Sequence, residues 1–193
     1  MQRICVFCGS NSGNSPEYLS AAVELGNLLP ENGIGLVYGG SNIGLMGALA
    51  DAVLKSGGHV TGVIPQSLVD REVAHGGLSD LRIVESMHER KALMADLADG
   101  FVALPGGYGT FDELCEILTW AQLGIHTKPI GLLNTLGYWE PFMGFLDHAV
   151  TAGFLGAGHR RLLGISDTAP ALLAMLRSSA APRPVEPKWP ALR

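Results

Sequence analysis

The sequence predicts an α/β fold: a single-domain, doubly wound, Rossmann-like parallel sheet with helices on both faces. Short apolar runs alternate with segments of helical periodicity along nearly the whole chain. The apolar runs lack the period-two pattern of half-exposed strands, so we expect both faces of each strand to be buried, as in parallel sheets. Strand–helix alternation with short connections implies right-handed crossovers. A chain of 193 residues is long enough to bury one substantial core.

The expected elements follow one another in regular order. Apolar runs are expected to be strands at residues 4–8, 35–38, 59–64, 81–84, 100–104, 129–133 and 162–165. Segments with helical spacing of apolar residues are expected to be helices at 16–29, 44–55, 87–98, 110–123, 138–151 and 170–176. Residues 65–80 lack clear periodicity and contain Arg71, Glu72 and His75. Because long loops in compact domains commonly serve function, we expect this loop to do so.

Composition and charge narrow the class of protein. Hydrophobic residues make up 47% of the chain and charged residues 16%, which is typical of a globular protein. The formal net charge of −5 gives no general attraction to nucleic acid or to anionic membranes, so we expect neither as a partner. No signal peptide is visible and no apolar stretch approaches the ~18 residues of a membrane span, so we expect a cytoplasmic protein.

We expect a single nucleotide-hydrolase domain over residues 1–179. Residues 180–193 carry four prolines and little helical pattern, which predicts a mobile C-terminal tail. Cys5 and Cys8 have C-x-x-C spacing, but they lie at an expected buried strand rather than at the start of a helix. A redox or metal role for this pair is therefore disfavoured.

Glycine-bearing turns follow three of the expected strands, at residues 8–13, 38–44 and 104–110. Ligands of doubly wound sheets bind beyond the carboxyl ends of the strands, and free N–H groups at helix N-termini attract phosphate. Ser10 in the first turn, and Gly39 and Gly40 in the second, are therefore candidate binding residues. The second turn lacks the G-x-G-x-x-G spacing, and no acidic residue ends the next strand, which argues against NAD.

The third turn is the most specific of these signals. No Lys-Ser/Thr pair follows its glycines, so it is not a Walker loop. Its candidate phosphate-binding residues are Gly106, Gly107, Tyr108, Gly109 and Thr110. The alternative is a helix cap with no ligand, because Thr110 and Glu113 have the spacing of a capping box.

A second polar cluster, Ser86-Met87-His88-Glu89-Arg90-Lys91, begins the helix before this turn. Arg90 and Lys91 lie where positive charge opposes the helix dipole, and a phosphate or carboxylate partner would remove that penalty. The alternative is a solvated basic face. Whether Arg90 reaches Glu113 on the next helix depends on how the two helices approach, which the sequence does not show.

The two motifs together resemble the LONELY GUY (LOG) family of cytokinin riboside 5′-monophosphate phosphoribohydrolases. Residues 105–113 match every fixed position of the family pattern P-G-G-x-G-T-x-x-E, although Asp112 stands where relatives often carry Glu. Residues 6–10, 38–40 and 119–126 also look like the family. The resemblance covers about residues 3–177.

The resemblance implies hydrolysis of the N-glycosidic bond of N6-modified adenine nucleoside 5′-monophosphates, and of AMP, to free base and ribose 5-phosphate. Breaking this bond builds positive charge on the sugar, which a carboxylate stabilises. Glu113 and Arg90 match the family's catalytic residues, and Glu72, Lys91 and Thr119 match positions that line its substrate site. The resemblance implies no cofactor and no metal.

Two alternatives to this hydrolase are a non-catalytic nucleotide-binding protein and a lysine decarboxylase. A non-catalytic nucleotide carrier or sensor on the same fold would keep the glycine turns without needing Arg90 and Glu113 together. Some relatives have been labelled lysine decarboxylases, but a pyridoxal phosphate enzyme needs a Schiff-base lysine with partners that orient the ring, and this chain has few lysines.

The helix expected at 110–123 also predicts a homodimer. Its apolar residues, Leu114, Cys115, Ile117, Leu118 and Ala121, spread over more than one narrow stripe. One stripe can cover the sheet, and the remainder would face water in a monomer. Isologous pairing through this helix would cover it. The resemblance to the LOG family also implies a dimer, since its members pair and can share substrate residues across the interface. The alternative is a central helix that is buried on all sides.

Overall fold

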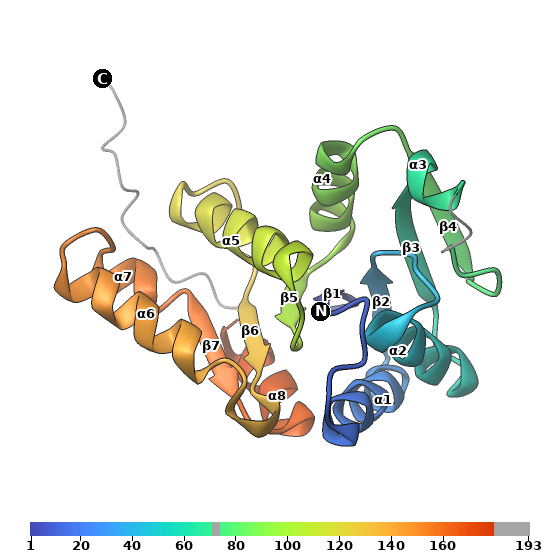
Figure 1. Ribbon diagram of the computed structural model, residues 1–193, viewed down its shortest axis with the longest axis horizontal. Coiled ribbons are helices and arrows are strands. Elements are labelled where there is room, and N and C mark those ends of the chain that lie inside the picture. Colours follow the sequence, from blue (N-terminus) through green and yellow to red (C-terminus); the bar gives the residue numbers. More distant parts are fainter. Residues whose placement is uncertain (71–73, 180–193) are drawn as a thin grey trace.

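Seven parallel strands form one sheet in the computed structural model, which describes residues 1–70 and 74–179 (Figure 1). Their order across the sheet is β4-β3-β2-β1-β5-β6-β7. The strands are β1 (Arg3–Phe7), β2 (Gly35–Tyr38), β3 (Val60–Pro65), β4 (Asp80–Val84), β5 (Gly100–Ala103), β6 (Ile130–Leu133) and β7 (Leu163–Ser166). Every neighbouring pair of strands is parallel, so the predicted fold class is confirmed.

The strand order reverses between β1 and β5. From β1 the chain adds β2, β3 and β4 on one side, and then returns to add β5, β6 and β7 on the other. The connection from β1 leads toward β2 on one side of the sheet, and the connection from β5 leads toward β6 on the other side. This divergence opens a crevice beyond the carboxyl ends of β1 and β5. Two of the three glycine turns noted in the sequence lie there, after Phe7 and after Ala103.

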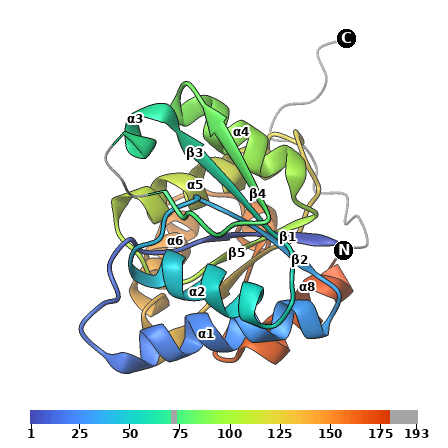
Figure 2. The same ribbon diagram turned by 90° about the vertical axis from the view of Figure 1, so that its right-hand side faces the viewer.

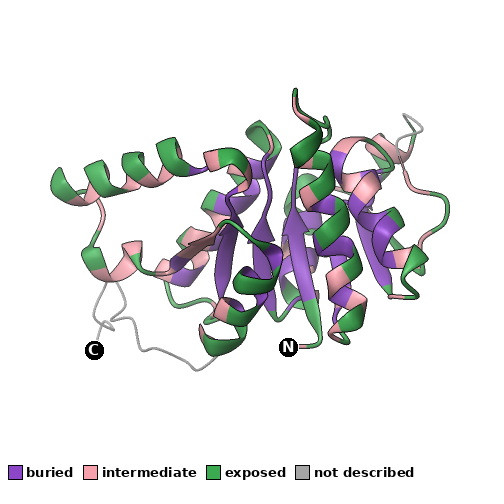
Figure 3. Cartoon of the chain, turned by 90° about the horizontal axis from the view of Figure 1, so that it is seen from below, coloured by how far each residue is buried: buried purple, intermediate pink, exposed green. Residues whose placement is uncertain are grey.

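Helices cover both faces of the sheet (Figure 2). One apolar cluster joins the strands to α1 (Pro16–Glu31), α2 (Gly44–Lys55) and α8 (Ala169–Ser179). The other joins them to α4 (Met87–Leu97), α5 (Tyr108–Gln122) and the partly buried side of α6 (Glu140–Thr151). The buried residues concentrate in the sheet between these helical layers (Figure 3).

Helix α6 is the least buried of the long helices, because none of its residues is buried. Phe142, Met143 and Leu146 pack against the sheet on one side. Phe145, on the same helix, is 64% exposed, and Phe154 just beyond it is 86% exposed. Phe145 and Phe154 are therefore exposed aromatic side chains that nothing in the described part of this chain covers.

Short helices are where the sequence analysis and the structure differ. The stretch expected to be an irregular loop contains α3 (Gln66–Val69), and α7 (Ala157–Arg160) and the 3-10 turn η1 (Thr135–Gly137) were not expected. Such short segments carry too few residues for periodicity to show. The expected tail, residues 180–193, and Arg71 and Glu72 lie outside the described residues. Among the helices that are described, none is long and apolar enough to cross a membrane.

Candidate active site

A cavity of about 700 Å³ lies at the carboxyl ends of β1 and β5. Two loops form its sides: residues 8–14 after β1, and Pro105-Gly106-Gly107 after β5, called the Pro-Gly-Gly loop below. Side chains from α1, α2, α3, α4 and α5 complete the wall. The residues that line it are Cys8, Gly9, Ser10, Asn11, Ser12, Gly13, Asn14, Tyr18, Leu45, Met46, Leu68, Arg90, Pro105, Gly106, Gly107, Tyr108, Gly109, Thr110, Glu113 and Tyr138.

Arg90 and Glu113 meet in the wall of this cavity. Arg90 Nη1 donates to Glu113 Oε1 over 2.8 Å, and the side chain of each is only 8% exposed. Ser86 fixes where α4 starts, because its Oγ accepts a hydrogen bond from the backbone N–H of Glu89. The start of α4 puts Arg90 in the first turn of that helix, and Glu113 follows in the second turn of α5. The structure thus joins the two residues that the motifs singled out.

The pair is largely removed from water. Burial raises the pKa of the Glu113 carboxyl, and the guanidinium of Arg90 works against that rise. Arg90 Nε donates to the Val63 carbonyl over 2.9 Å, which leaves Nη2 as the end of the guanidinium without a hydrogen-bond partner among the described residues. Because Arg90 lines the cavity, its guanidinium can contact a ligand there.

Gly39 makes room for this guanidinium. A Cβ at Gly39 would overlap Arg90 Nη2 and would meet Arg90 Cζ at 3.3 Å. The pairing of β2 with β3 ends at Tyr38 and Gly62, so the Val63 carbonyl that holds Arg90 lies just beyond the last pair. Gly39 and Gly40 do not line the cavity. Gly39 instead lies against the guanidinium of Arg90. Gly40 has a φ of +77°, a backbone conformation that favours glycine.

The N-terminus of α5 has no side-chain cap. The helix begins at Tyr108, its N-cap is Gly107, and no side chain accepts a hydrogen bond there. The interpretation of Thr110 and Glu113 as a capping box is therefore wrong: Thr110 lies inside the first turn, and the Glu113 side chain bonds Arg90 instead. The first N–H groups of α5 consequently have no side-chain acceptor, as an anion site requires, and their residues line the cavity.

Lys91 is buried rather than solvated, so the interpretation of residues 86–91 as a solvated basic face is wrong. Its Nζ lies 2.9 Å from Asp112 Oδ2 and 3.2 Å from Glu116 Oε2. Burial alone would lower the pKa of Lys91, but the two carboxylates outweigh it and raise that pKa. Lys91 does not line the cavity; it ties α4 to the second and third turns of α5 beside the Arg90–Glu113 pair.

The other predicted site residues divide into three groups. Ser10 and residues 106–110 line the cavity. Thr119 lies outside it, on an exposed side of α5, where its hydroxyl donates to the Cys115 carbonyl. Glu72 lies outside the described residues.

Aromatic side chains of the cavity were missed by the sequence analysis. Tyr18 from α1 and Tyr138 from the turn before α6 both line it, and their rings meet edge to face at 6.1 Å. Tyr138 follows β6, so the rule that ligands lie beyond the carboxyl ends of strands could have pointed to it. That strand exit lacks the run of glycines that drew attention to the others.

The cysteines do not form a reactive pair. Cys5 and Cys8 are both free and buried, and burial raises the pKa of each thiol well above its ordinary value. A thiol with a raised pKa carries little thiolate and is a poor nucleophile. Across residues 1–70 and 74–179, no group of three or more His, Cys, Asp or Glu side chains is arranged to hold a metal ion.

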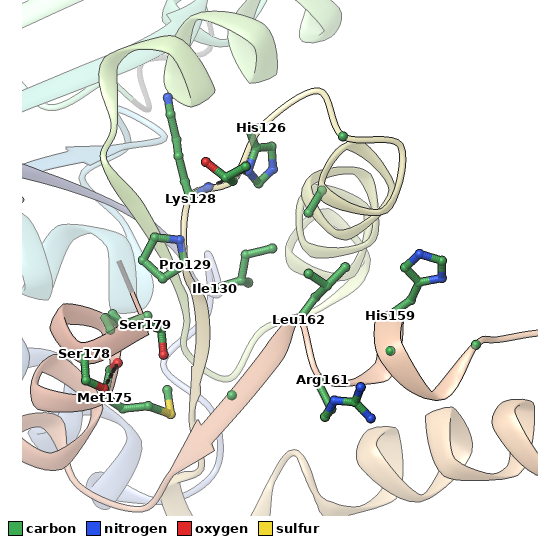
Figure 4. A pocket seen from close by; sticks show the side chains of 17 residues that line it. His126, Lys128, Pro129, Ile130, His159, Arg161, Leu162, Met175, Ser178 and Ser179 are labelled. Atoms are coloured by element: carbon green, nitrogen blue, oxygen red, sulfur yellow. Dashed lines mark hydrogen bonds between the residues drawn. The ribbon is translucent and has the colours of Figure 1, made fainter. Parts of the chain in front are cut away.

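A larger cavity, of about 1190 Å³, adjoins the starts of β6 and β7 at the opposite edge of the sheet (Figure 4). Its polar side chains mainly serve the fold. Lys128 Nζ donates to the Ala95 carbonyl over 2.7 Å, and His126 Nε2 lies 3.0 Å from the Ile117 carbonyl. None of the described residues that line this cavity carries a carboxylate, so the carboxylate that the sequence analysis expects in the active site is found only at the smaller of these two cavities.

The fold and the site define a class: a Rossmann-like α/β protein with a buried arginine–carboxylate pair beside an uncapped helix N-terminus at the reversal point of its sheet. Residues 46–176 match the family model described as "Possible lysine decarboxylase". The cytokinin riboside 5′-monophosphate phosphoribohydrolase LOG of Oryza sativa subsp. japonica is 55% identical over 175 residues, which cover 91% of this chain and 72% of that protein. The corresponding LOG2 of Arabidopsis thaliana is 51% identical over 175 residues, covering 91% and 82%.

This chain belongs to the LOG family, so the predicted resemblance is confirmed. Among solved structures, the molybdenum cofactor carrier protein of Chlamydomonas reinhardtii matches with a TM-score of 0.69. That match covers 93% of this chain and 98% of that one at 21% identity, so it shows a shared fold alone.

Proposed function

We propose that this protein hydrolyses cytokinin riboside 5′-monophosphates, and AMP, to the free base and ribose 5-phosphate. The relatives that are 50–55% identical are named for this activity on cytokinin nucleotides. The observation that carries the proposal is the buried Arg90–Glu113 pair in the wall of the cavity. A non-catalytic binding protein has no need to keep a desolvated carboxylate there, because burying it costs free energy.

In the proposed reaction the bond between ribose C1′ and the base nitrogen breaks, and a bond from water oxygen to C1′ forms. The bonding electrons leave with the base, so positive charge develops on the sugar. The Glu113 carboxylate stabilises that charge and accepts one proton of the attacking water. The departing base takes up one proton from solvent at the nitrogen that was bonded to C1′, and Glu113 returns its proton to solvent, so that free base and ribose 5-phosphate are released. Arg90 keeps Glu113 ionised and oriented, and its guanidinium contacts the substrate.

The 5′-phosphate is assigned to the N-terminus of α5. Three features support this: the N-terminal N–H groups have no side-chain cap, the Pro-Gly-Gly loop lines the cavity, and Thr110 and Ser10 add hydroxyls. A phosphate there is attracted by the helix dipole and by the free donors. Cleavage of nucleoside monophosphates should therefore be much faster than cleavage of nucleosides.

A homodimer completes the proposal. Leu123 and Ile125 at the end of α5 are 44% and 64% exposed, and Phe145 and Phe154 expose a further apolar surface on and beside α6. Both helices cover the same face of the sheet, and isologous pairing would bury these side chains. Thr119 lies on the exposed side of α5, about 9 Å along the helix from Glu113, so we place its contact with substrate in the site of the partner subunit.

Three further assignments come with this proposal. Lys91 supports the substrate site through its ion pairs with α5, and Glu72 is proposed as a substrate-binding residue because it matches a position of the family's substrate site. Location in the cytoplasm stays a prediction from the sequence. The competing function is a nucleotide carrier or sensor, and release of base decides between the two. The assay is incubation with isopentenyladenosine 5′-monophosphate or AMP and chromatographic measurement of base and ribose 5-phosphate.

A further inference from the structure

The turn that follows β6 has an unusual backbone and lies beside the cavity. Leu136 has a φ of +55°, in the left-handed region that leucine rarely occupies, and its side chain is 62% exposed. Gly137 follows with a φ of +71°. Backbone of this kind persists only where the surrounding structure holds it in place.

Asn134 and Trp139 hold the two ends of this turn. Asn134 Oδ1 accepts the backbone N–H of Trp139 over 2.9 Å, and its Nδ2 donates to Asp167 Oδ1 over 2.9 Å. The backbone N–H of Asn134 donates to the Ser166 carbonyl at the end of β7. Trp139 is completely buried, with its ring against Phe111 of α5. The residue between these fixed points, Tyr138, therefore has little freedom to move.

Tyr138 spans from this turn to the Pro-Gly-Gly loop after β5. Its hydroxyl donates a short hydrogen bond to the Gly106 carbonyl, and both residues line the cavity. Tyr18 and Trp139 pack edge to face on its ring, at 6.1 Å and 5.2 Å. The hydroxyl thus links the exit of β6 to the loop that is assigned to the phosphate.

This hydrogen bond fixes the direction of a backbone donor. In a planar trans peptide the C=O and the following N–H point in opposite directions, and the described chain has no cis peptide. The Gly106 carbonyl is turned toward Tyr138, so the Gly107 N–H is turned away from it. Gly107 is the N-cap of α5, and its N–H has no hydrogen-bond partner among the described residues.

We infer that Tyr138 is a positioning residue for phosphate recognition: its hydroxyl holds the Gly106–Gly107 peptide so that the Gly107 N–H is presented to the 5′-phosphate. The inference rests on the proposed function for the identity of the ligand. Tyr138 does not act on the reacting bond. Loss of its hydroxyl should weaken binding of phosphorylated ligands and leave the chemical step nearly unchanged.

The test is Tyr138→Phe, which keeps the ring packing and removes only the hydroxyl. Loss of one hydrogen bond predicts a rise of about three- to ten-fold in KM for AMP, with kcat within about twofold of the unsubstituted protein. The Kd for ribose 5-phosphate, measured by calorimetry, should rise by the same factor. Binding of adenosine, which has no phosphate, should not change. Ser178→Ala, which removes a hydroxyl-to-carbonyl hydrogen bond on α8, is the control and should change none of these values.

The outcomes separate this inference from the proposed function. If Tyr138→Phe binds ribose 5-phosphate as tightly as the unsubstituted protein, the positioning role is refuted, whether or not base is released. If adenosine and ribose 5-phosphate weaken equally, the hydroxyl shapes the cavity in general and the inference is also refuted. If only ribose 5-phosphate weakens but no nucleotide is cleaved, the positioning role stands and the proposed reaction fails.

Discussion

Substitution of Gly39 by alanine tests whether the space behind Arg90 matters for catalysis. The φ of Gly39 lies outside the region that favours glycine, so alanine can adopt the same backbone. Its Cβ would nevertheless overlap Arg90 Nη2 and would lie 3.1 Å from Met46 Sδ. Arg90 has little room to yield, because Nε and Nη1 are bonded to Val63 and Glu113 over 2.9 Å and 2.8 Å.

The expected effect follows from the size of that displacement. Restoring an ordinary contact of about 3.5 Å requires the guanidinium to move by on the order of 1 Å. A misplacement of that size at a catalytic group can lower activity about 100-fold. Overpacking costs about 1–3 kcal/mol of folding free energy, which a typical domain tolerates. We therefore expect Gly39→Ala to fold and to lose about 100-fold in kcat/KM.

The assay is base release from AMP, with thermal unfolding followed in parallel. Gly35→Ala, in the strand β2 that ends just before Gly39, is the matched control, because its Cβ would meet its nearest neighbour, the His59 carbonyl, at an ordinary 3.4 Å. It should retain kcat/KM within about twofold. A Gly39→Ala protein with kcat/KM equal to that of Gly35→Ala would refute the claim that Gly39 keeps Arg90 in place.

Three further predictions concern the carboxylate, its protonation and the dimer. Glu113→Gln keeps an acceptor for Arg90 but loses the charge, so base release should fall on the order of 1000-fold with the fold intact; a folded, fully active variant would exclude Glu113. Burial raises the pKa of Glu113 above its ordinary 4.5, and its ionised form is lost as pH falls through the raised value. The acid limb of the profile of kcat/KM against pH should therefore lie above pH 4.5. It should move to higher pH in Arg90→Ala, because the positive charge that opposes the rise in the Glu113 pKa is gone. A limb that stays at the same pH in Arg90→Ala would contradict the claim that Arg90 controls the ionisation of Glu113. Phe145→Glu should give a monomer with reduced activity by light scattering at micromolar protein, whereas Leu19→Glu, on the other face of the sheet, should stay dimeric; an active monomer of the unsubstituted protein would contradict the dimer.

Much of the fold could be predicted from the sequence because its signals are local. Most strands are short apolar runs, and each long helix carries enough turns for its periodicity to show. The expectation that every strand is buried on both faces is wrong for β4, which contains Asp80 and Arg82, lies at the edge of the sheet and has no buried residue. The turns after Phe7 and Ala103 were located by their glycines, and the rule for doubly wound sheets placed them at one edge. The start of α5 was placed two residues late, because Tyr108 and Gly109 do not signal a helix and Thr110 resembles a cap.

The site itself depended on contacts that local patterns do not carry. The motifs selected Arg90 and Glu113, but only the packing of α4 against α5 brings their side chains to 2.8 Å. Lys91 looked like a surface residue because its partners Asp112 and Glu116 lie on another helix. The direction of Tyr138 depends on the left-handed turn before it, and a leucine in that conformation gives no signal in the sequence.

The central claim is that the cavity cleaves an N-glycosidic bond in a phosphorylated nucleoside. The most direct measurement is a panel of isopentenyladenosine 5′-monophosphate, AMP, GMP, CMP and adenosine, with base and ribose 5-phosphate measured together. We expect equimolar base and ribose 5-phosphate from the adenine nucleotides, and kcat/KM for adenosine far below that for AMP. Absence of base from every nucleotide, with binding retained, would contradict hydrolysis and favour a carrier.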